Sequence, residues 1–337
     1  MCKITYDEVK SNYHDQATKV NQVVSDYQKE YQEYLLALAK YKESTGDKSA
    51  VDGSEIVQNL YIGDESLSEV NFTPSNNVNV TYTEKVPVVA GEIHYDWQNW
   101  ADKGYTLVYG FSGDTTGNLG TATWTNLTNS YYVDNQNEKH KISKITIQFS
   151  NEKLYENKPG FSEAYNGADV GLAIYSGFSY GLWYLNSDSI DVDFTFYDEN
   201  GKPIDFSKNE AYLGFGSLNH WNSSTQGFGE NHSSDYKHVE HVKILEGGIG
   251  VNLAGSTVTN HFGDEFSDNE NSNKNDWGLF KISGNHVKFT WYTEHKNDIN
   301  TSQLYTIATA IPTYSGLKQP SKPTVSYKYS TVIVYLD

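Results

Sequence analysis

The sequence contains no arginine, and it has one cysteine and one methionine among its 337 residues. Its positive charge therefore comes from lysine alone, and the formal net charge is -18. Arginine makes the best paired contacts with phosphate and guanine, and an acidic protein repels phosphate backbones. Although acidity is often only a means of solubility, we expect nucleic acid and anionic membrane surfaces to be poor partners unless a metal ion or a lysine patch intervenes.

The single cysteine, Cys2, excludes an intramolecular disulfide and a cysteine-based zinc site. The sequence also lacks any run apolar enough to span a bilayer, and residues 1–10 do not have the features of a signal peptide. We interpret the chain as a segment of a longer secreted protein, whose export and anchoring signals lie outside it.

Aromatic residues and glycine are abundant instead, with 27 Tyr, 14 Phe, 7 Trp and 27 Gly. Aromatic and β-branched side chains fit the pleated, half-buried surface of a sheet. A chain of this length can form one large β domain and an extension. The composition therefore predicts an all-β fold with an aromatic core.

Helical periodicity is confined to residues 6–43, where apolar residues recur at steps of three and four. This pattern predicts a coiled-coil-like helix that ends at Gly46, and we assign residues 1–45 to a helical stalk segment. A stripe this rich in tyrosine suits packing against a second segment of chain better than a tight zipper. Its members are Tyr13, Val20, Val24, Tyr27, Tyr31, Tyr34, Leu38 and Tyr41.

After Asp52 the period changes to two, which is the period of β-strands. About ten strands with turns between them predict a sandwich, and the β domain is expected to span residues 52–337. Asn200 and Gly201 favour a tight turn, so residues 191–197 and 202–206 should form a hairpin. The predicted strands are residues 77–83, 105–111, 121–124, 142–149, 170–175, 190–197, 239–245, 287–292, 304–311 and 325–335.

Two stretches interrupt this alternation. Residues 213–235 are rich in Gly, Asn, Ser and His, and residues 260–276 are polar and acidic. Both are predicted to be long loops, which in compact domains are usually functional or disordered. Pro320 and Pro323 mark the expected start of a proline-rich segment.

Two short segments have the composition of a sugar-binding site. A pyranose stacks its apolar face on an aromatic ring and offers its hydroxyls to planar amides or carboxylates. Trp221, with His220 and Asn222 beside it, meets this requirement, and Trp183 with Asn186 meets it too. A place in the core is the alternative for both tryptophans, and it is favoured for Trp124, Trp277 and Trp291.

Catalytic and metal-binding patterns are weak. His238 and His241 point to opposite faces of a strand and therefore should not share a metal ion. No spacing among the 43 Asp and Glu residues marks a pair of catalytic carboxylates, and no serine nucleophile motif is present, so we expect no enzymatic activity. Calcium prefers clustered oxygens but also a defined loop spacing, which one acidic stretch does not provide. That stretch contains Asp264, Glu265, Asp268, Glu270 and Asp276.

Five motifs are notable along the chain: NLY at residues 59–61, TATWTNLTNSYY at 121–132, KISKI at 141–145, FTFYDENGKPIDF at 194–206 and SLN at 217–219. Together they resemble the variable domain of the streptococcal antigen I/II surface adhesins. Their order is the order in that family. The layout is similar too, because a helix precedes the β domain and a proline-rich segment begins near residue 320.

This resemblance implies a lectin-like β supersandwich, a fold shared with glucan-binding protein C and aggregation-substance adhesin domains. It implies an extracellular, wall-anchored Gram-positive adhesin that acts in colonisation and biofilm formation. Its partners would be host glycoproteins of the salivary agglutinin or scavenger-receptor type, or microbial surface proteins and glycans. It also implies one bound calcium or other divalent metal ion, and pairing of the stalk helix with the proline-rich segment.

Two other functions remain open besides the lectin-like adhesin. The chain could be a protein–protein docking module without carbohydrate recognition, or a glucan-binding domain. A third and less favoured alternative is an enzyme acting on polysaccharide. Binding to a glycan array would separate sugar recognition from protein docking.

Overall fold

The computed structural model describes residues 6–45, 50–65, 68–88, 101, 103–155, 160–222, 235–256, 258–268, 272–298, 302–312 and 320–324. The chain divides into two compact units, Met1–Lys48 with Ser315–Asp337, and Ser49–Tyr314. The strand predicted at residues 325–335 lies outside the described residues.

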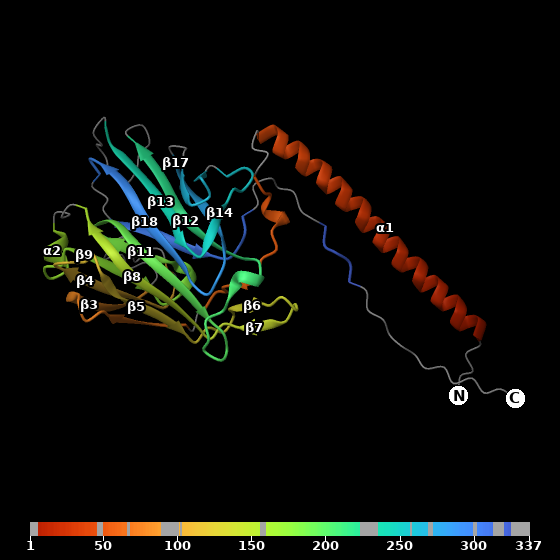
Figure 1. Ribbon diagram of the computed structural model, residues 1–337, viewed down its shortest axis with the longest axis horizontal. Helices are drawn as coiled ribbons and strands as arrows, with labels where there is room; N and C mark the ends of the chain where they lie inside the picture. The colour runs from red at the N-terminus through yellow and green to blue at the C-terminus, as the bar shows by residue number, and fades with distance from the viewer. Residues whose placement is uncertain are drawn as a thin grey trace. The chain divides into compact units, whose positions relative to one another are not determined.

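The first unit contains the predicted helix, α1 (Tyr6–Thr45) (Figure 1). Its tyrosine stripe is buried only toward the C-terminal end, since Tyr34 and Leu38 are 6% and 3% exposed while Tyr13 is 76% exposed. Tyr27 and Tyr31 stack on each other at 5.9 Å between ring centroids. Among the described helices, none is long and apolar enough to cross a membrane.

A peptide of residues 6–45 should be only partly helical in dilute solution. Isolated helices gain little from propensity alone and depend on packing of an apolar face, and three members of this stripe, Tyr13, Val20 and Val24, are exposed in the chain itself. Circular dichroism at 222 nm, compared with the signal in helix-promoting alcohol, measures the helical fraction. A fully helical and monomeric peptide would contradict the prediction that the stalk needs a partner segment.

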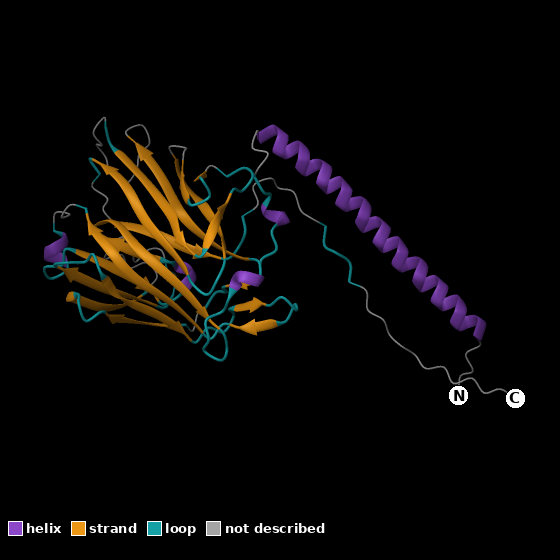
Figure 2. Cartoon of the chain, in the orientation of Figure 1, coloured by secondary structure: helices purple, strands orange, loops and turns teal. Residues whose placement is uncertain are grey.

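The second unit is made almost entirely of strands, which Figure 2 shows in orange. It also contains one short helix, α2 (Phe161–Ala164), and 3-10 turns at Gly53–Glu55, Phe178–Tyr180 and Phe206–Lys208. The strands are β1 (Leu60–Tyr61), β2 (Glu69–Pro74), β3 (Asn79–Pro87), β4 (Tyr105–Ser112), β5 (Asn118–Thr125), β6 (Tyr131–Val133), β7 (Lys139–Lys141), β8 (Lys144–Leu154), β9 (Val170–Tyr175), β10 (Leu182–Leu185), β11 (Ser187–Tyr197), β12 (Ala211–Asn222), β13 (Lys237–Glu246), β14 (Gly248–Val251), β15 (Val258–His261), β16 (Glu265–Asp268), β17 (Ser272–Ile282), β18 (Val287–Lys296) and β19 (Ser302–Ala308).

Most of these strands belong to one 16-stranded sheet, whose main path runs β2-β5-β8-β11-β18-β13-β12-β19-β10-β9-β4-β3. The path folds back on itself, because strands at its two ends pack face to face. Phe72 of β2 lies 4.6 Å from Tyr109 of β4 between ring centroids. Trp124 of β5 donates from Nε1 to the carbonyl of Tyr175 in β9 at 3.0 Å. The all-β sandwich with an N-terminal helix is therefore confirmed.

Aromatic rings fill the space between the two layers. Phe194 of β11 lies 5.7 Å from Phe215 of β12 and 5.9 Å from Phe289 of β18, measured between ring centroids. Trp124 and Trp291 are fully buried, as expected from the sequence. Each such side chain contributes roughly 1.5–3 kcal/mol by leaving water, so the aromatic content predicted from composition forms one continuous core.

Three local predictions were wrong. Residues up to 222 of the expected loop at 213–235 form strand β12, and the stretch at 260–276 contributes to strands β15, β16 and β17. Backbone hydrogen bonds in a sheet do not require apolar side chains, so polar strands escape a hydrophobicity pattern. Residues 202–206 do turn back after Gly201, but they form only a single bridge, between Tyr197 and Pro203, instead of a strand.

Candidate functional site

The inward-facing row of β13 changes from apolar to ionisable along the strand. Ile244 and Val242 belong to the sandwich core, and the next residues on the same face are Glu240 and His238. All of them are buried, and His238 is fully so. Two ionisable side chains therefore occupy positions where the alternation of the strand would place core residues.

The neighbouring strand β18 changes at the same level. Its inward row runs from Phe289 and Trp291, which are fully buried, to Thr293 and His295. In the antiparallel register, His238 lies directly opposite His295, and Glu240 lies opposite Thr293. Since opposite residues of paired strands have adjacent side chains, the register brings the two imidazoles together at one end of the core.

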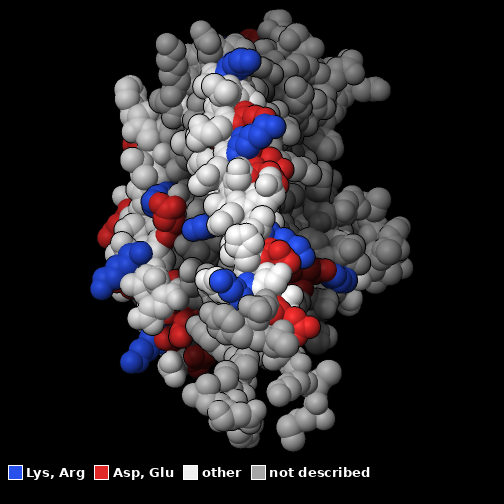
Figure 3. Space-filling view, turned by 90° about the vertical axis from the view of Figure 1, so that its right-hand side faces the viewer, with Lys and Arg blue, Asp and Glu red and all other residues white. Residues whose placement is uncertain are grey.

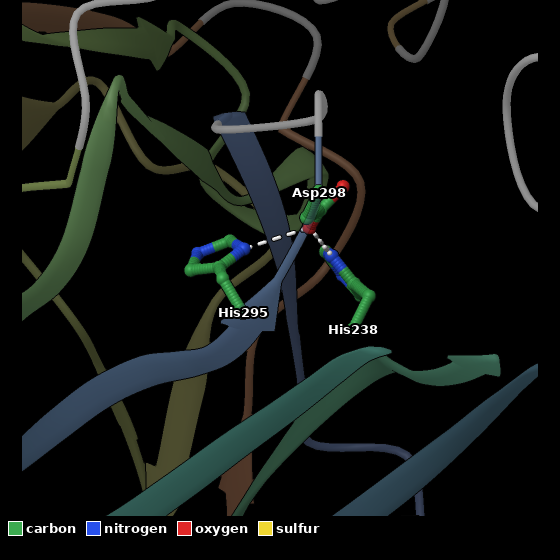
Figure 4. Close-up of side chains that lie close together, drawn as sticks. All are labelled: His238, His295 and Asp298. Atoms are coloured by element: carbon green, nitrogen blue, oxygen red, sulfur yellow. Dashed lines mark hydrogen bonds and ion pairs between the residues drawn. The ribbon is translucent and has the colours of Figure 1, made fainter. Parts of the chain in front are cut away.

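A carboxylate from the loop after β18 joins the two imidazoles, as Figure 4 shows. Asp298 Oδ2 lies 2.6 Å from His238 Nδ1 and 2.7 Å from His295 Nδ1. The chain reverses at Asn297, whose φ of 51° lies in the left-handed region that asparagine tolerates well. The other oxygen, Oδ1, accepts a hydrogen bond from the Tyr236 hydroxyl at 3.2 Å.

Glu240 holds the opposite edge of the His238 ring. Its Oε1 lies 3.1 Å from His238 Nε2, and its Oε2 accepts bonds from the backbone N and Nδ2 of Asn219, at 2.9 and 3.2 Å. Asn219 reaches this position after an irregularity in β12, where Ser217 has a φ of 66°. Buried polar groups are thus paired with one another, as their burial requires.

The second layer contributes a hydroxyl to this region. Tyr184 of β10 shares a hydrogen bond of 2.9 Å with Thr293 Oγ1, which links the two layers. We call this region the polar end of the sandwich core and define it by Tyr184, His238, Glu240, Thr293, His295 and Asp298.

Burial and hydrogen bonding set the charges at the polar end. Burial lowers the pKa of His238, but hydrogen bonds to Asp298 and Glu240 outweigh it and raise this pKa to about 9. Burial also raises the pKa of the Glu240 carboxyl, although the bonds from His238 and Asn219 oppose it. Burial strongly raises the pKa of the Tyr184 hydroxyl. The two acceptors, Asp298 and Glu240, therefore favour the protonated imidazole of His238.

Trp221 lies at this polar end, whereas its predicted neighbours do not join it. Its ring stacks on His238 at 4.5 Å between centroids, and the side chain is 4% exposed. His220 points to the other face of β12, where Nδ1 donates to the carbonyl of Asp268 at 2.9 Å. The backbone of Asn222 pairs with Lys237, but its side chain lies outside the described residues.

The second predicted pair lies elsewhere. Trp183 belongs to a separate apolar cluster with Phe161 and Leu304, and its Nε1 donates to the Tyr175 hydroxyl at 2.8 Å. Asn186 is buried in the turn between β10 and β11, with a φ of 56°, and donates to the carbonyl of Asp169 at 2.7 Å. The structure does not bring either side chain to Trp221.

Comparisons with known proteins give the family. The model of the family described as glucan-binding protein C matches residues 43–313, which is more than half of the chain. The chain belongs to the glucan-binding protein C family. This is a family of binding proteins rather than enzymes, so the prediction of a non-enzymatic chain is confirmed.

Solved structures also match this chain. One is the glucan-binding protein C of Streptococcus mutans, with 19% identity, a TM-score of 0.52, and coverage of 95% of this chain and 98% of that chain. Another is the adhesin domain of PrgB from Enterococcus faecalis, with 15% identity, a TM-score of 0.49, and coverage of 78% of this chain and 92% of that chain.

The PrgB adhesin domain bound to DNA also matches, with 13% identity, a TM-score of 0.46, and coverage of 75% of this chain and 98% of that chain. The expectation that nucleic acid is a poor partner of this chain stays a prediction. The comparisons do not single out the antigen I/II variable domain within this group of adhesins.

The sequence analysis did not predict the cluster of His238, His295 and Asp298 in this member of the glucan-binding protein C family. It rightly separated His238 from His241, which lies on the other face and bonds Glu265 at 3.0 Å. The true neighbours of His238 are His295 and Asp298. The sequence did contain a signal. The polar residues at 238, 240, 293 and 295 occupy alternate positions of their strands, on the same face as the core residues of those strands.

The acidic stretch expected to form a loop is partly structured. Glu265 accepts bonds from His241 and from the Tyr292 hydroxyl, and Asp268 is buried in β16. The side chains of Glu270 and Asp276 lie outside the described residues. Among the described side chains, the clusters that could hold a metal ion are His238 with His295 and Asp298, and Asp134 with Glu138 and His140.

Replacing Glu152 by glutamine should raise the melting temperature at pH 8 and change it less at pH 5. Glu152 is fully buried, and burial raises the pKa of its carboxyl well above the usual value, although a bond of 2.7 Å from Ser187 opposes this. An acid with a raised pKa in the folded state stabilises the fold below its unfolded pKa and loses that contribution as pH rises. Glutamine removes this loss.

Thermal melts of Glu152→Gln at both pH values test the prediction. The exposed Glu138 provides the control, because Glu138→Gln should leave the melting temperature unchanged at both. A shift of equal size at pH 5 and pH 8 in Glu152→Gln would contradict the argument.

Proposed function

We propose that this chain is the ligand-binding domain of an extracellular bacterial adhesin and that it binds a glucan or a related surface glycan. The observation that carries the proposal is the match to the glucan-binding protein C family over residues 43–313. The related protein from Streptococcus mutans is described as mediating sucrose-independent and sucrose-dependent adherence. An adhesin role for this chain is consistent with the family match and with the described role of this related protein.

The polar end supplies the chemistry that such a ligand needs. Its accessible margin contains the Asp188 carboxylate, whose side chain is 45% exposed, and the half-buried Tyr155, whose ring stacks on His295 at 4.3 Å. Rings and carboxylates side by side suit the apolar face and the hydroxyls of a pyranose. Trp221 supports this margin from within by fixing His238.

The proposal includes a place on the cell surface and a set of partners. The full-length protein is anchored to the wall of a Gram-positive cell, and it takes part in colonisation and biofilm formation as an antigen I/II-type adhesin does. Host glycoproteins of the salivary agglutinin type and microbial surface proteins are further partners. One divalent metal ion accompanies the domain.

Direct binding measurements on the purified chain test the proposal. Dextran, a panel of surface glycans on an array, a mucin-type glycoprotein and duplex DNA are the probes. We expect saturable binding to dextran or to an array glycan that free monosaccharide competes for. Binding to protein alone, with no glycan bound, would establish the docking module instead.

The DNA probe needs a salt series. On the face shown in Figure 3, lysine and acidic side chains are interspersed, and the net charge is -18. Any DNA binding should therefore weaken steeply with salt, because phosphate contacts release counterions. Tight DNA binding at physiological salt, with no glycan bound, would contradict the glycan proposal.

A further inference from the structure

His238, His295 and Asp298 bring two imidazole nitrogens and one carboxylate oxygen together at a buried place. We propose that these three residues form a binding site for a divalent transition metal ion of the Zn²⁺ class, at the inner face of β13 and β18 (Figure 4). The side chains of His238, His295 and Asp298 are 0%, 1% and 0% exposed, respectively. This inference rests on the proposed function only for the presence of one divalent ion, to which it assigns three residues and a chemical class.

The three ligand atoms already converge. His238 Nδ1 and His295 Nδ1 lie 2.6 and 2.7 Å from the same oxygen, Asp298 Oδ2, and the three atoms lie within 4.8 Å of one another. Zinc binds imidazole nitrogen and carboxylate oxygen at about 2.0–2.2 Å, which separates tetrahedral ligands by about 3.3 Å. Side-chain shifts of under about 1 Å would admit the ion, given these distances.

The backbone fixes the three residues before any ion arrives. His238 and His295 are directly opposed in the β13–β18 ladder. Asp298 follows His295 by three residues, across the left-handed turn at Asn297. Ligands on paired strands and a tight turn lose little freedom on binding, which is what a preformed metal site requires.

The His238 imidazole also has a carboxylate on its far side, since its Nε2 lies 3.1 Å from Glu240. His295 Nε2 lies 4.0 Å from Asp188 and makes no hydrogen bond to a described residue. Metal-binding histidines usually present their second nitrogen to a carboxylate, which fixes the tautomer and makes the ligand more basic. Glu240 is in turn held by two bonds from Asn219, and Asp298 by the Tyr236 hydroxyl.

The donor set selects the class of ion. Two nitrogens and one carboxylate suit Zn²⁺ and its neighbours, whereas Ca²⁺ takes six to eight oxygen ligands. The ion would also offset the negative charges that Asp298 and Glu240 place in a buried region. Three protein ligands leave a fourth position for water.

Metal titration of the chain, dialysed first against a chelator, tests this site. We expect one tightly bound Zn²⁺ per chain by calorimetry and mass spectrometry, a higher melting temperature with Zn²⁺, and ligand-field absorption when Co²⁺ replaces it. Asp298→Asn keeps the size of the side chain, so it should fold and lose at least about 100-fold in affinity, and His295→Ala should do the same. Glu240→Gln should lose about 10- to 100-fold.

The second cluster supplies a matched control. His140 lies 3.1 Å from Asp134 on the β6–β7 hairpin, and His140→Ala removes a half-buried imidazole without touching the proposed site. This variant should keep the tight Zn²⁺. The proposal is overturned if folded Asp298→Asn binds Zn²⁺ as tightly as the wild type. It is also overturned if the wild type binds only Ca²⁺ or no ion. The three side chains would then be held together by hydrogen bonds alone.

Discussion

Phe194→Ala should lower the free energy of unfolding by about 3–5 kcal/mol, because a fully buried ring leaves a cavity that its neighbours fill only in part. Phe194 is 0% exposed and contacts rings from both layers, Phe215 in β12 and Phe289 in β18. Urea denaturation followed by circular dichroism measures the loss. Wild-type residues 50–312 should unfold in one transition, since one aromatic core joins the layers.

Phe262 is the matched control for this substitution. It is fully exposed at the tip of the β15–β16 hairpin, with a φ of 62°. Phe262→Ala should change the free energy of unfolding by no more than about 0.5 kcal/mol. Equal losses in the two variants, or separate transitions for the two layers, would show that the core is not continuous.

Trp221→Ala should weaken glycan binding by about 2 kcal/mol, which is roughly 30-fold and as large as the loss of an aromatic contact, although the buried ring acts indirectly by holding His238 in place. The ring stacks on His238 and keeps the polar end in place. Binding and melting temperature must both be measured, because a buried tryptophan also stabilises the fold. Lost binding by a folded variant supports the site, and unchanged binding by a folded variant rejects it.

Trp277 offers a tryptophan on the other face of the same sheet. It packs over Gly216, where an added Cβ would lie 2.8 Å from the Trp277 ring, so only glycine leaves room for it. Trp277→Ala should destabilise the fold while leaving the affinity of the remaining folded protein unchanged. If Trp277→Ala and Trp221→Ala lower affinity equally, the effect comes from stability alone.

Elements with strong periodicity were predictable. The heptad pattern gave α1 nearly to its ends, and residues 170–175 matched β9 at both bounds. Apolar alternation reports the burial of one face, and it does so wherever that face meets the core. Strands β15 and β16 were missed because their side chains are mostly polar, although their backbones pair with each other. Strand β12 was missed although Leu213, Phe215 and Leu218 lie in the core, because the irregularity between Phe215 and Leu218 breaks the alternation.

The candidate site was only half predictable. Trp221 was predicted from the polar residues beside it in the sequence, and it lies at the polar end. Trp183 was predicted for the same reason, but it lies in a separate apolar cluster. Sequence proximity also grouped His220 with Trp221, although adjacent residues of a strand point to opposite faces. Asn186 is engaged with the backbone of Asp169.

The sequence by itself determined the class of the fold, the helix at its start, the aromatic character of the core and the adhesin-like family. The fold class, the helix and the core follow from local periodicity and composition, whereas the family was indicated by the resemblance of short motifs. The tertiary structure decided that His238, His295 and Asp298 meet. That meeting depends on the register between β13 and β18 and on the turn at Asn297. A one-residue slip in that register would send one imidazole to the other face, and no local pattern specifies it.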